Sequence, residues 1–242
     1  VGHVILDCTT LSPRVADLDI TYPILGYLAG HYAGTANPVF IGLPSKIAED
    51  KLKAVGAAAA SAGGVGLFHV VGCTPEAPTL SAVVSDSAAL PTHSITAEVL
   101  RDTRAELSTA QVGAKLDAVS LGTPHASFDE IEALHNELID GEAIAPHVQF
   151  YINTGRTVLQ QATDAGYIQK LEELGVKIVA DTCAYMTSIF LPGTKTVMTN
   201  SGKVAHYAPG NMGVDIVLAT LRECVASARA GVVTLDSELF NG

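Results

Sequence analysis

The fold class is decided by the stretch Ala118-Val119-Ser120-Leu121-Gly122-Thr123-Pro124-His125-Ala126-Ser127. Its first four residues form an apolar-rich run that predicts a strand, and residues 122–125 predict the turn that follows it. Ser127 and Glu130 then form a Ser-x-x-Glu capping box in front of apolar Ile131, Leu134 and Leu138. This box predicts a helix over residues 128–139. The stretch is therefore one strand-turn-helix unit.

The same alternation of short apolar runs and helical patterns continues on both sides of this unit. The predicted strands are Val4–Leu6, Pro38–Ile41, Gly66–Val71, Ala118–Leu121, Val148–Ile152, Lys177–Ala180 and Thr196–Thr199. The predicted helices are Pro23–Ala33, Ile47–Ala62, Thr96–Ser108, Phe128–Ile139, Thr157–Leu174 and Met212–Ala230. Alternation of this kind is typical of βαβ units, and nearly continuous apolar strands are typical of sheets covered on both faces. We therefore expect an α/β fold with largely parallel sheets.

A short polar stretch at Ser108–Gly113 follows a charged helical pattern and precedes the next strand. It predicts two α/β lobes, residues 1–112 and 113–235. Residues 236–242 have no clear pattern, so we expect a tail or a linker there. The chain begins with Val and runs directly into a strand-like segment, from which we expect a processed product or a piece of a larger protein.

Composition narrows the classes of function. The chain has 242 residues, of which 48% are hydrophobic and 16% charged, so it can bury a substantial core. Its net charge of -11, without a stretch rich in Lys and Arg, argues against binding nucleic acid or a membrane surface and favours small molecules. Four cysteines without a CxxC motif are typical of a reducing compartment. Because the apolar runs are also too short to span a membrane, we predict a soluble, cytoplasmic protein.

Two strand ends carry candidate functional groups. Gly122-Thr123-Pro124-His125 follows a predicted strand, and ligands of open α/β sheets bind at the carboxyl ends of strands. There His125 provides a group that titrates near neutral pH, although a tight turn with an incidental surface histidine explains the same residues equally well. Asp181-Thr182-Cys183 also follows a strand. The thiolate of Cys183 is a candidate nucleophile or metal ligand, with a buried inert cysteine as the alternative.

The segment from Asn200 to Gly210 is predicted to be a polar loop after the strand Thr196–Thr199. Its Ser201 and Lys203 can hold a carboxylate or phosphate, which leaves His206 or Tyr207 for proton transfer. The segment lacks the GxxxxGK[ST] pattern of a nucleotide-binding P-loop. A well hydrogen-bonded surface loop is the less favoured alternative. Elsewhere, His69 in an apolar strand is predicted to be a satisfied core residue.

Three of these segments, Leu121–Ser127, Ala180–Cys183 and Lys195–Gly210, resemble in order and spacing the large catalytic part of aconitase X proteins. The earlier Phe68–Gly72 and Thr74–Ala77 are similar too, so that the likeness covers most of the chain. The resemblance implies aconitase-like, three-layer α/β/α lobes around an iron-sulfur cluster, with a separate swivelling domain or small subunit. It also implies a hydro-lyase that dehydrates a small hydroxy acid.

The activities implied by the resemblance are dehydration of cis-3-hydroxy-L-proline and of mevalonate 5-phosphate. Cys183 would ligate the cluster, and His125 or His206 would transfer a proton. Four further residues complete the predicted site and are expected to bind the substrate: Thr123, Asn200, Ser201 and Lys203. Some members of the family have Cys at the position of Thr123, which removes one cluster ligand here and favours hydroxyproline as the substrate.

Two further hypotheses belong to other functional classes. One is a non-catalytic scaffold or regulatory fragment, because the family's large part is longer at its N-terminus and the swivelling domain is not recognisable in these 242 residues. The other is an unrelated cysteine-dependent enzyme, with Cys183 as the nucleophile and His125 or His206 as its base.

Overall fold

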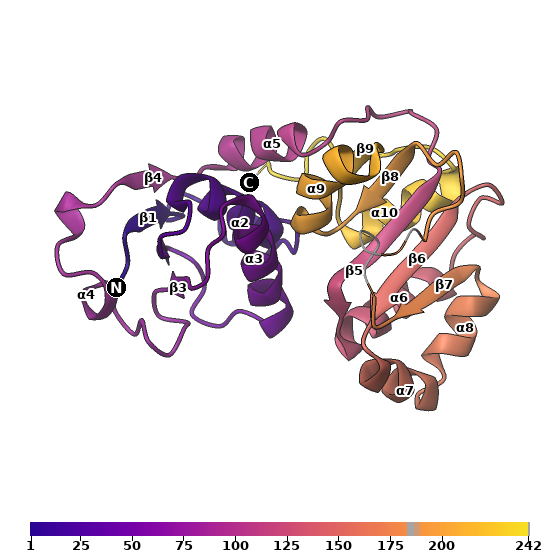
Figure 1. Ribbon diagram of the computed structural model, residues 1–242, viewed down its shortest axis with the longest axis horizontal. Helices are drawn as coiled ribbons and strands as arrows, with labels where there is room; N and C mark the ends of the chain where they lie inside the picture. Colours follow the sequence, from indigo (N-terminus) through magenta and orange to yellow (C-terminus); the bar gives the residue numbers. More distant parts are fainter. Residues whose placement is uncertain (183–186, 188, 242) are drawn as a thin grey trace. The chain divides into compact units, whose positions relative to one another are not determined.

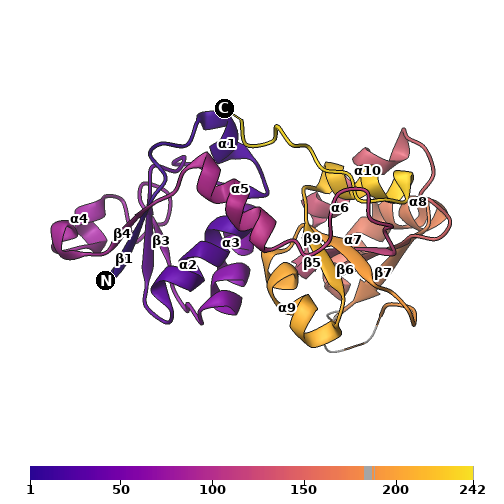
Figure 2. The same ribbon diagram turned by 90° about the horizontal axis from the view of Figure 1, so that it is seen from above.

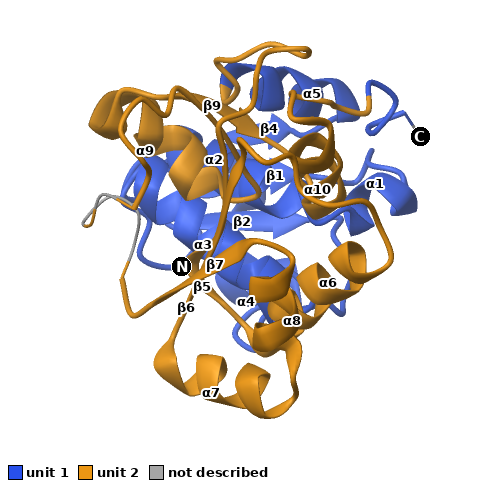
Figure 3. Ribbon diagram, turned by 90° about the vertical axis from the view of Figure 1, so that its right-hand side faces the viewer, with its two compact units in different colours: residues 1–106, 237–242 blue, residues 107–236 orange. Residues whose placement is uncertain are grey.

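The computed structural model describes residues 1–182, 187 and 189–241 (Figure 1). Two compact units make up the chain: unit 1 comprises residues 1–106 and 237–242, and unit 2 comprises residues 107–236 (Figure 3). The last residues therefore group with the first unit. A compact unit need not be an independently folding domain, so the lobes 1–112 and 113–235 with a tail at 236–242 remain a proposal.

Unit 1 contains one sheet with the strand order β3-β2-β1-β4, in which every pairing is parallel. Its elements are β1 Val4–Asp7, α1 Pro13–Asp17, α2 Thr21–Ala33, β2 Pro38–Ile41, α3 Glu49–Ala62, β3 His69–Val70, α4 Leu80–Val83, a 3-10 turn Ser87–Ala89, β4 Thr92–Ser94 and α5 Ala97–Glu106. The short strand β4 was not predicted from the sequence, because Thr92, His93 and Ser94 carry no apolar pattern.

Helices α2 and α3 pack closely because two glycines of α2 face α3. A Cβ atom at Gly26 would lie 2.4 Å from the carbonyl oxygen of Val55, and one at Gly30 would lie 2.7 Å from that of Ala59. Small residues let helix backbones approach, and any larger side chain here would have to push the helices apart.

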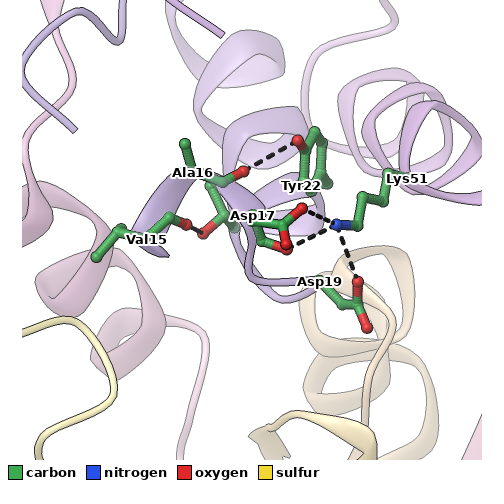
Figure 4. Close-up of polar contacts among 7 residues, drawn as sticks. Val15, Ala16, Asp17, Asp19, Tyr22 and Lys51 are labelled. Atoms are coloured by element: carbon green, nitrogen blue, oxygen red, sulfur yellow. Dashed lines mark hydrogen bonds and ion pairs between the residues drawn. The ribbon is translucent and has the colours of Figure 1, made fainter. Parts of the chain in front are cut away.

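Lys51 of α3 holds the connection between α1 and α2 (Figure 4). Its ammonium nitrogen lies 2.9 Å from a carboxylate oxygen of Asp17 and 3.4 Å from one of Asp19, and 5.3 Å from the ring centroid of Tyr22. The Tyr22 hydroxyl donates to the carbonyl of Ala16 at 3.0 Å. Burial, followed by the charge of Asp17, raises the pKa of Tyr22 to about 12, so the phenol keeps the proton that it donates.

His69 lies in the core of unit 1, as predicted, but it is not satisfied there. Its side chain is buried, and neither ring nitrogen has a hydrogen-bond partner among the described residues. Burial lowers the pKa of His69 below its ordinary value, so the ring is neutral near pH 7.

Unit 2 contains a five-stranded sheet with the order β7-β6-β5-β8-β9, and its strand pairings are also parallel. Its elements are β5 Ala118–Ala126, α6 Phe128–Ile139, β6 Gln149–Thr154, α7 Arg156–Asp164, α8 Tyr167–Glu173, β7 Val176–Ala180, β8 Thr196–Thr199, α9 Gly202–Met212, β9 Asp215–Leu218 and α10 Leu221–Ala230. The parallel sheets with flanking helices confirm the predicted α/β fold.

The core of unit 2 lies on one face of its sheet. Buried side chains of α6, α7, α8 and α10 form a single hydrophobic cluster with Val119, Phe150 and Met198 of the strands. Helix α9 covers the opposite face, which gives three layers (Figure 2). Two capping boxes fix the first turns of α6 and α10, that of Ser127 with Glu130 and that of Thr220 with Glu223. The first confirms the predicted start of α6.

Three helix and loop predictions in unit 2 were wrong. The expected helix 157–174 is two helices, because Gly166 adopts a left-handed φ of 82° between them. The expected helix 212–230 contains β9 and begins only at Leu221, since Asp215–Leu218 pairs with β8. The expected loop 200–210 is mostly α9. There, burial of Val204, Ala205 and Ala208 outweighs the helix-breaking tendency of Pro209 and Gly210.

Among the described residues, no helix combines the length and the apolar character needed to cross a membrane.

Candidate functional site

The candidate site lies at the carboxyl ends of the strands of unit 2, where the strand order reverses. The chain runs from β5 through β6 to β7 on one side and then returns to place β8 and β9 on the other side of β5. Because β5 and β8 are neighbours, the segments that follow them start side by side and then run to opposite sides of the sheet. Ligands of open parallel sheets bind at such a switch point.

Residues 122–125, predicted to form a turn after the strand, lie within β5, whose pairing with β6 is irregular between Leu121 and Ala126. This second half of β5 begins at Gly122, which has a left-handed φ of 73°. A Cβ atom at this position would lie 2.2 Å from the carbonyl oxygen of Asn153, so only glycine allows β5 to approach β6 here. The Thr123-Pro124 peptide bond that follows is cis. The Thr123 side chain is buried, and its hydroxyl has no hydrogen-bond partner among the described residues.

Ser201 connects Thr123 of β5 to the start of α9. Its hydroxyl donates to the carbonyl oxygen of Thr123 at 2.7 Å and accepts from the backbone N–H of Val204 at 3.3 Å. The backbone N–H of Ser201 itself donates to the hydroxyl of Thr199 at 3.2 Å. The structure thus brings two predicted substrate-binding residues, Thr123 and Ser201, into direct contact, and it shows Ser201 as the N-cap of α9.

The other residues of the 200–209 segment are arranged around the first turns of α9. Asn200 and Lys203 are half-buried, whereas His206 is exposed with its ring centroid 5.1 Å from that of Tyr207. Lys203, His206 and Tyr207 belong to α9, and Asn200 directly precedes its N-cap Ser201. These side chains are therefore spaced as on a helix and not as in a loop. Their predicted roles in binding and proton transfer remain proposals.

His125 and Asp181 lie at the ends of β5 and β7, on either side of β6, and the charge of His125 acts on Asp181. Asp181 adopts a φ of 54°, and its carboxylate accepts from the backbone N–H of Arg156 at 3.0 Å and from the Arg156 side chain at 2.5 Å. These two hydrogen bonds, aided by the charges of Arg156 and His125, hold the pKa of Asp181 below its ordinary value. The exposed His125 side chain therefore has an ionised carboxylate near it.

Asn153 is a polar residue of this region that the sequence analysis missed. It lies on β6, is fully buried, and donates from its amide nitrogen to the carbonyl oxygen of Thr182 at 3.1 Å. The signal was present in the sequence, because the predicted strand Val148–Ile152 is followed at once by Asn153, a polar residue at a strand end. The strand instead continues to Thr154, which places Asn153 inside the sheet.

Cys183, the predicted metal ligand, lies outside the described residues. The described residues contain no group of three or more His, Cys, Asp or Glu side chains that could hold a metal ion. Among the described cysteines, Cys224 belongs to the hydrophobic core of unit 2. In unit 1, burial and then the charge of Asp7 raise the pKa of Cys8 to about 12, which makes its thiol a poor nucleophile.

Two family models match consecutive parts of the chain: Aconitase X second domain over residues 2–105 and Aconitase X third domain over residues 116–230. The cis-3-hydroxy-L-proline dehydratase of Pseudomonas aeruginosa is 40% identical over 216 residues, which are 88% of this chain and 37% of that protein. The phosphomevalonate dehydratase large subunit of Methanosarcina mazei is 33% identical over 213 residues, which are 87% of this chain and 49% of that protein.

A solved structure has the same fold. The crystal structure of Thermococcus kodakaraensis aconitase X in its holo-form matches with a TM-score of 0.79 at 26% sequence identity, covering 94% of this chain and 55% of that chain. The present chain thus spans 37% and 49% of the length of the two relatives named above. Because two successive domain models of one family and a solved member of that family cover nearly all of it, the chain belongs to the aconitase X family.

Proposed function

We propose that this chain is the α/β part of a hydro-lyase that removes water from a small hydroxy acid, with cis-3-hydroxy-L-proline as the substrate. The 40% identity to the Pseudomonas aeruginosa dehydratase over 88% of the chain supports this substrate. The hydroxyl side chain of Thr123 supports it as well, because it departs from the cysteine-containing pattern that we associate with the phosphomevalonate enzymes. Mevalonate 5-phosphate is the alternative substrate, supported by the 33% identity to a phosphomevalonate dehydratase large subunit.

The observation that carries the proposal is the buried, unpaired hydroxyl of Thr123 at the switch point of unit 2. A buried hydroxyl without a hydrogen bond is unfavourable by about 1–3 kcal/mol, and Thr123 Oγ1 has no partner in the described part of the chain. A polar ligand that hydrogen-bonds to Thr123 would remove this penalty. The position at a strand end beside the N-cap of α9 is where a substrate carboxylate is expected.

The remaining roles follow from the chemistry of dehydration. The enzyme must take a proton from one carbon while the hydroxyl on the neighbouring carbon leaves as water, and the electron pair of the broken C–H bond forms the new double bond. We assign the proton transfers to His125 or His206 and the binding of the substrate anion to Asn200, Lys203 and Ser201, whose hydroxyl would exchange its hydrogen bond to Thr123 for one to the anion.

An iron-sulfur cluster with Cys183 as a ligand remains part of the proposal, but the described residues do not fit a cluster by themselves. Clusters are held by cysteine thiolates, whereas Thr123 and Asn153 offer a hydroxyl and an amide. The remaining ligands would have to come from outside the described residues. Iron and sulfide analysis of anaerobically purified full-length protein tests this part: Cys183→Ser should lower the cluster content, and unchanged content would remove Cys183 as a ligand.

The activity is tested with the full-length protein and its remaining domains or small subunit. We expect conversion of cis-3-hydroxy-L-proline with loss of one water, measured by mass spectrometry of the product, and no conversion of mevalonate 5-phosphate. Preference for mevalonate 5-phosphate would support the alternative substrate. If iron-loaded protein converts neither compound, the proposal is wrong and a non-catalytic scaffold becomes the better hypothesis.

Two further parts of the proposal concern partner and location. We propose that a swivelling domain or small subunit completes the site, because the chain spans less than half of the two relatives named above and one of them is named a large subunit. We propose a cytoplasmic location, which the free thiols of Cys8 and Cys73 support. The cysteine-nucleophile alternative predicts that alkylating Cys183 in metal-free protein abolishes an activity that does not need iron.

A further inference from the structure

Unit 1 contains a small cavity on elements that the candidate dehydratase site does not use. Helices α2 and α5 lie side by side in this unit (Figures 1 and 2). The cavity between them has a volume of about 240 Å³ and is lined by Tyr27, His31 and Tyr32 of α2 and by Asp102 and Glu106 of α5. Pockets for drug-sized ligands measure about 300–1,000 Å³, so this one fits a group of the size of a side chain.

The α2 side of the cavity is aromatic. Tyr27 and His31 are one helical turn apart, with ring centroids 6.4 Å apart and ring planes inclined by 20°. Tyr32 is held from outside the helix, because its ring stacks on that of His93 of β4 with centroids 3.8 Å apart. The faces of aromatic rings attract cations. This wall therefore favours a flat cation over an anion.

The α5 side of the cavity carries two exposed carboxylates in an arrangement that a cation would stabilise. Asp102 and Glu106 are four residues apart on one helix, where like charges repel each other. Glu106 is also the last residue of α5, where the helix dipole disfavours a negative charge. Neither carboxylate forms an ion pair within the part of the chain that the structure describes.

A hydrogen bond joins the two walls. The Tyr27 hydroxyl donates to the carboxylate of Glu106 at 2.8 Å. Burial, followed by this hydrogen bond, raises the pKa of Tyr27 to about 12, so the phenol remains a neutral donor. A carboxylate accepts several hydrogen bonds. Glu106 is therefore held at the cavity and can still accept from a ligand.

We propose that this cavity binds a guanidinium group. The planar cation stacks on the aromatic side chains of α2 while its N–H groups donate to Asp102 and Glu106, whereas an ammonium group is not planar and cannot do both in this way. The proposal is independent of the dehydratase function. The guanidinium group comes either from a free small molecule or from an arginine of the remaining protein, and the experiment distinguishes these two sources.

Isothermal titration calorimetry of the full-length protein with N-propylguanidinium tests the proposal. N-propylurea is the matched control ligand, because it has a similar shape without the charge. We expect saturable binding of the guanidinium compound alone. Asp102→Asn and Glu106→Gln should each weaken it at least about fivefold, because a charged acceptor is lost. Glu172→Gln, at an exposed glutamate near the end of α8, is the control variant and should bind like the wild type.

Two substitutions of Tyr32 test the aromatic half of the site. Tyr32→Leu should weaken binding of N-propylguanidinium several-fold, whereas Tyr32→Phe keeps the ring and should not. Equal affinities of these two variants would overturn the guanidinium assignment, because the carboxylates alone would then explain the attraction. Thermal unfolding first shows that each variant is folded. The substitutions of the exposed Asp102 and Glu106 decide the proposal if Tyr32→Leu does not fold.

The unfolding temperature of the full-length protein identifies the source of the guanidinium group if the free compound does not bind. An arginine of the remaining protein that already fills the cavity would lose its partner in Asp102→Asn, which should lower the unfolding temperature by about 2 °C or more. In an empty cavity the same substitution removes a repulsion and should raise it slightly. No binding of N-propylguanidinium, together with an unchanged or raised unfolding temperature of Asp102→Asn, would overturn the proposal.

Discussion

Replacing Gly122 by alanine should destabilise unit 2 by two separable effects. The first is backbone strain, because alanine at a φ of 73° costs about 1–2 kcal/mol. The second is overpacking. The new Cβ would lie 2.2 Å from the carbonyl oxygen of Asn153, so β5 would have to move away from β6. Overpacking in a close-packed interior adds about 1–3 kcal/mol. We therefore expect a total loss of about 3 kcal/mol.

Gly113 provides the control, because it also has a positive φ but lacks the contact. It lies in the same unit with a φ of 85°, and a Cβ atom there would meet no heavy atom within 4 Å. Gly113→Ala should therefore show the strain alone, about 1–2 kcal/mol. Both glycine variants remove a similar amount of unfolded-state entropy, so the difference between them measures the contact with Asn153.

Urea unfolding of both variants measures these losses, with fluorescence and circular dichroism as two probes. We expect the Gly122→Ala midpoint to fall further than that of Gly113→Ala, at a similar dependence on urea concentration. The two variants would be equally destabilised if β5 and β6 could separate freely, and a difference below about 0.5 kcal/mol would refute the argument from close approach. Because Thr123 follows directly, we also expect loss of activity in the Gly122→Ala enzyme.

Three further predictions concern single side chains of unit 2. Ser127→Ala should lower the free energy of unfolding by about 1 kcal/mol through loss of the α6 cap, while Ser45→Ala at an exposed site should not; urea unfolding measures both. Because the folded pKa of Asp181 is below its unfolded value of about 3.9, its ionised form stabilises the protein above that pH and this contribution is lost on acidification. When the pH is lowered below about 4, the unfolding temperature of the Asp181→Asn variant should therefore fall by less than that of the wild type. His125→Gln should lower kcat by about a hundredfold with little change in KM, and an unchanged kcat would exclude His125 as the proton-transfer group.

The sequence predicted the part of the fold that depends on local pattern. The strand and capped helix around Ser127 were predicted because a capping box and an apolar periodicity act within a few residues. The same kind of signal at Thr220 and Glu223 marks the start of α10, but it was overlooked inside a longer helical pattern. Helix α9 was not predictable in this way, because Gly202, Pro209 and Gly210 disfavour a helix locally and only burial against the sheet compensates.

The sequence also indicated which segments carry chemistry, since polar residues after predicted strands must meet at one edge of a parallel sheet. It could not show which of them touch. The hydrogen bond between Ser201 and Thr123 joins residues 78 positions apart, and that between Asn153 and Thr182 joins residues 29 positions apart. Such pairs depend on the strand order β7-β6-β5-β8-β9, which no local pattern specifies.

The sequence by itself therefore determined the α/β class, the capped helix α6 and, through its motifs, the resemblance to aconitase X. The tertiary structure decided that residues 202–212 form a helix, that Ser201 contacts Thr123, and that the buried Asn153 donates to the carbonyl of Thr182. The physical reason is one of range. Caps and periodicities act between neighbours along the chain, whereas burial and side-chain hydrogen bonds depend on which strands the completed sheet places side by side.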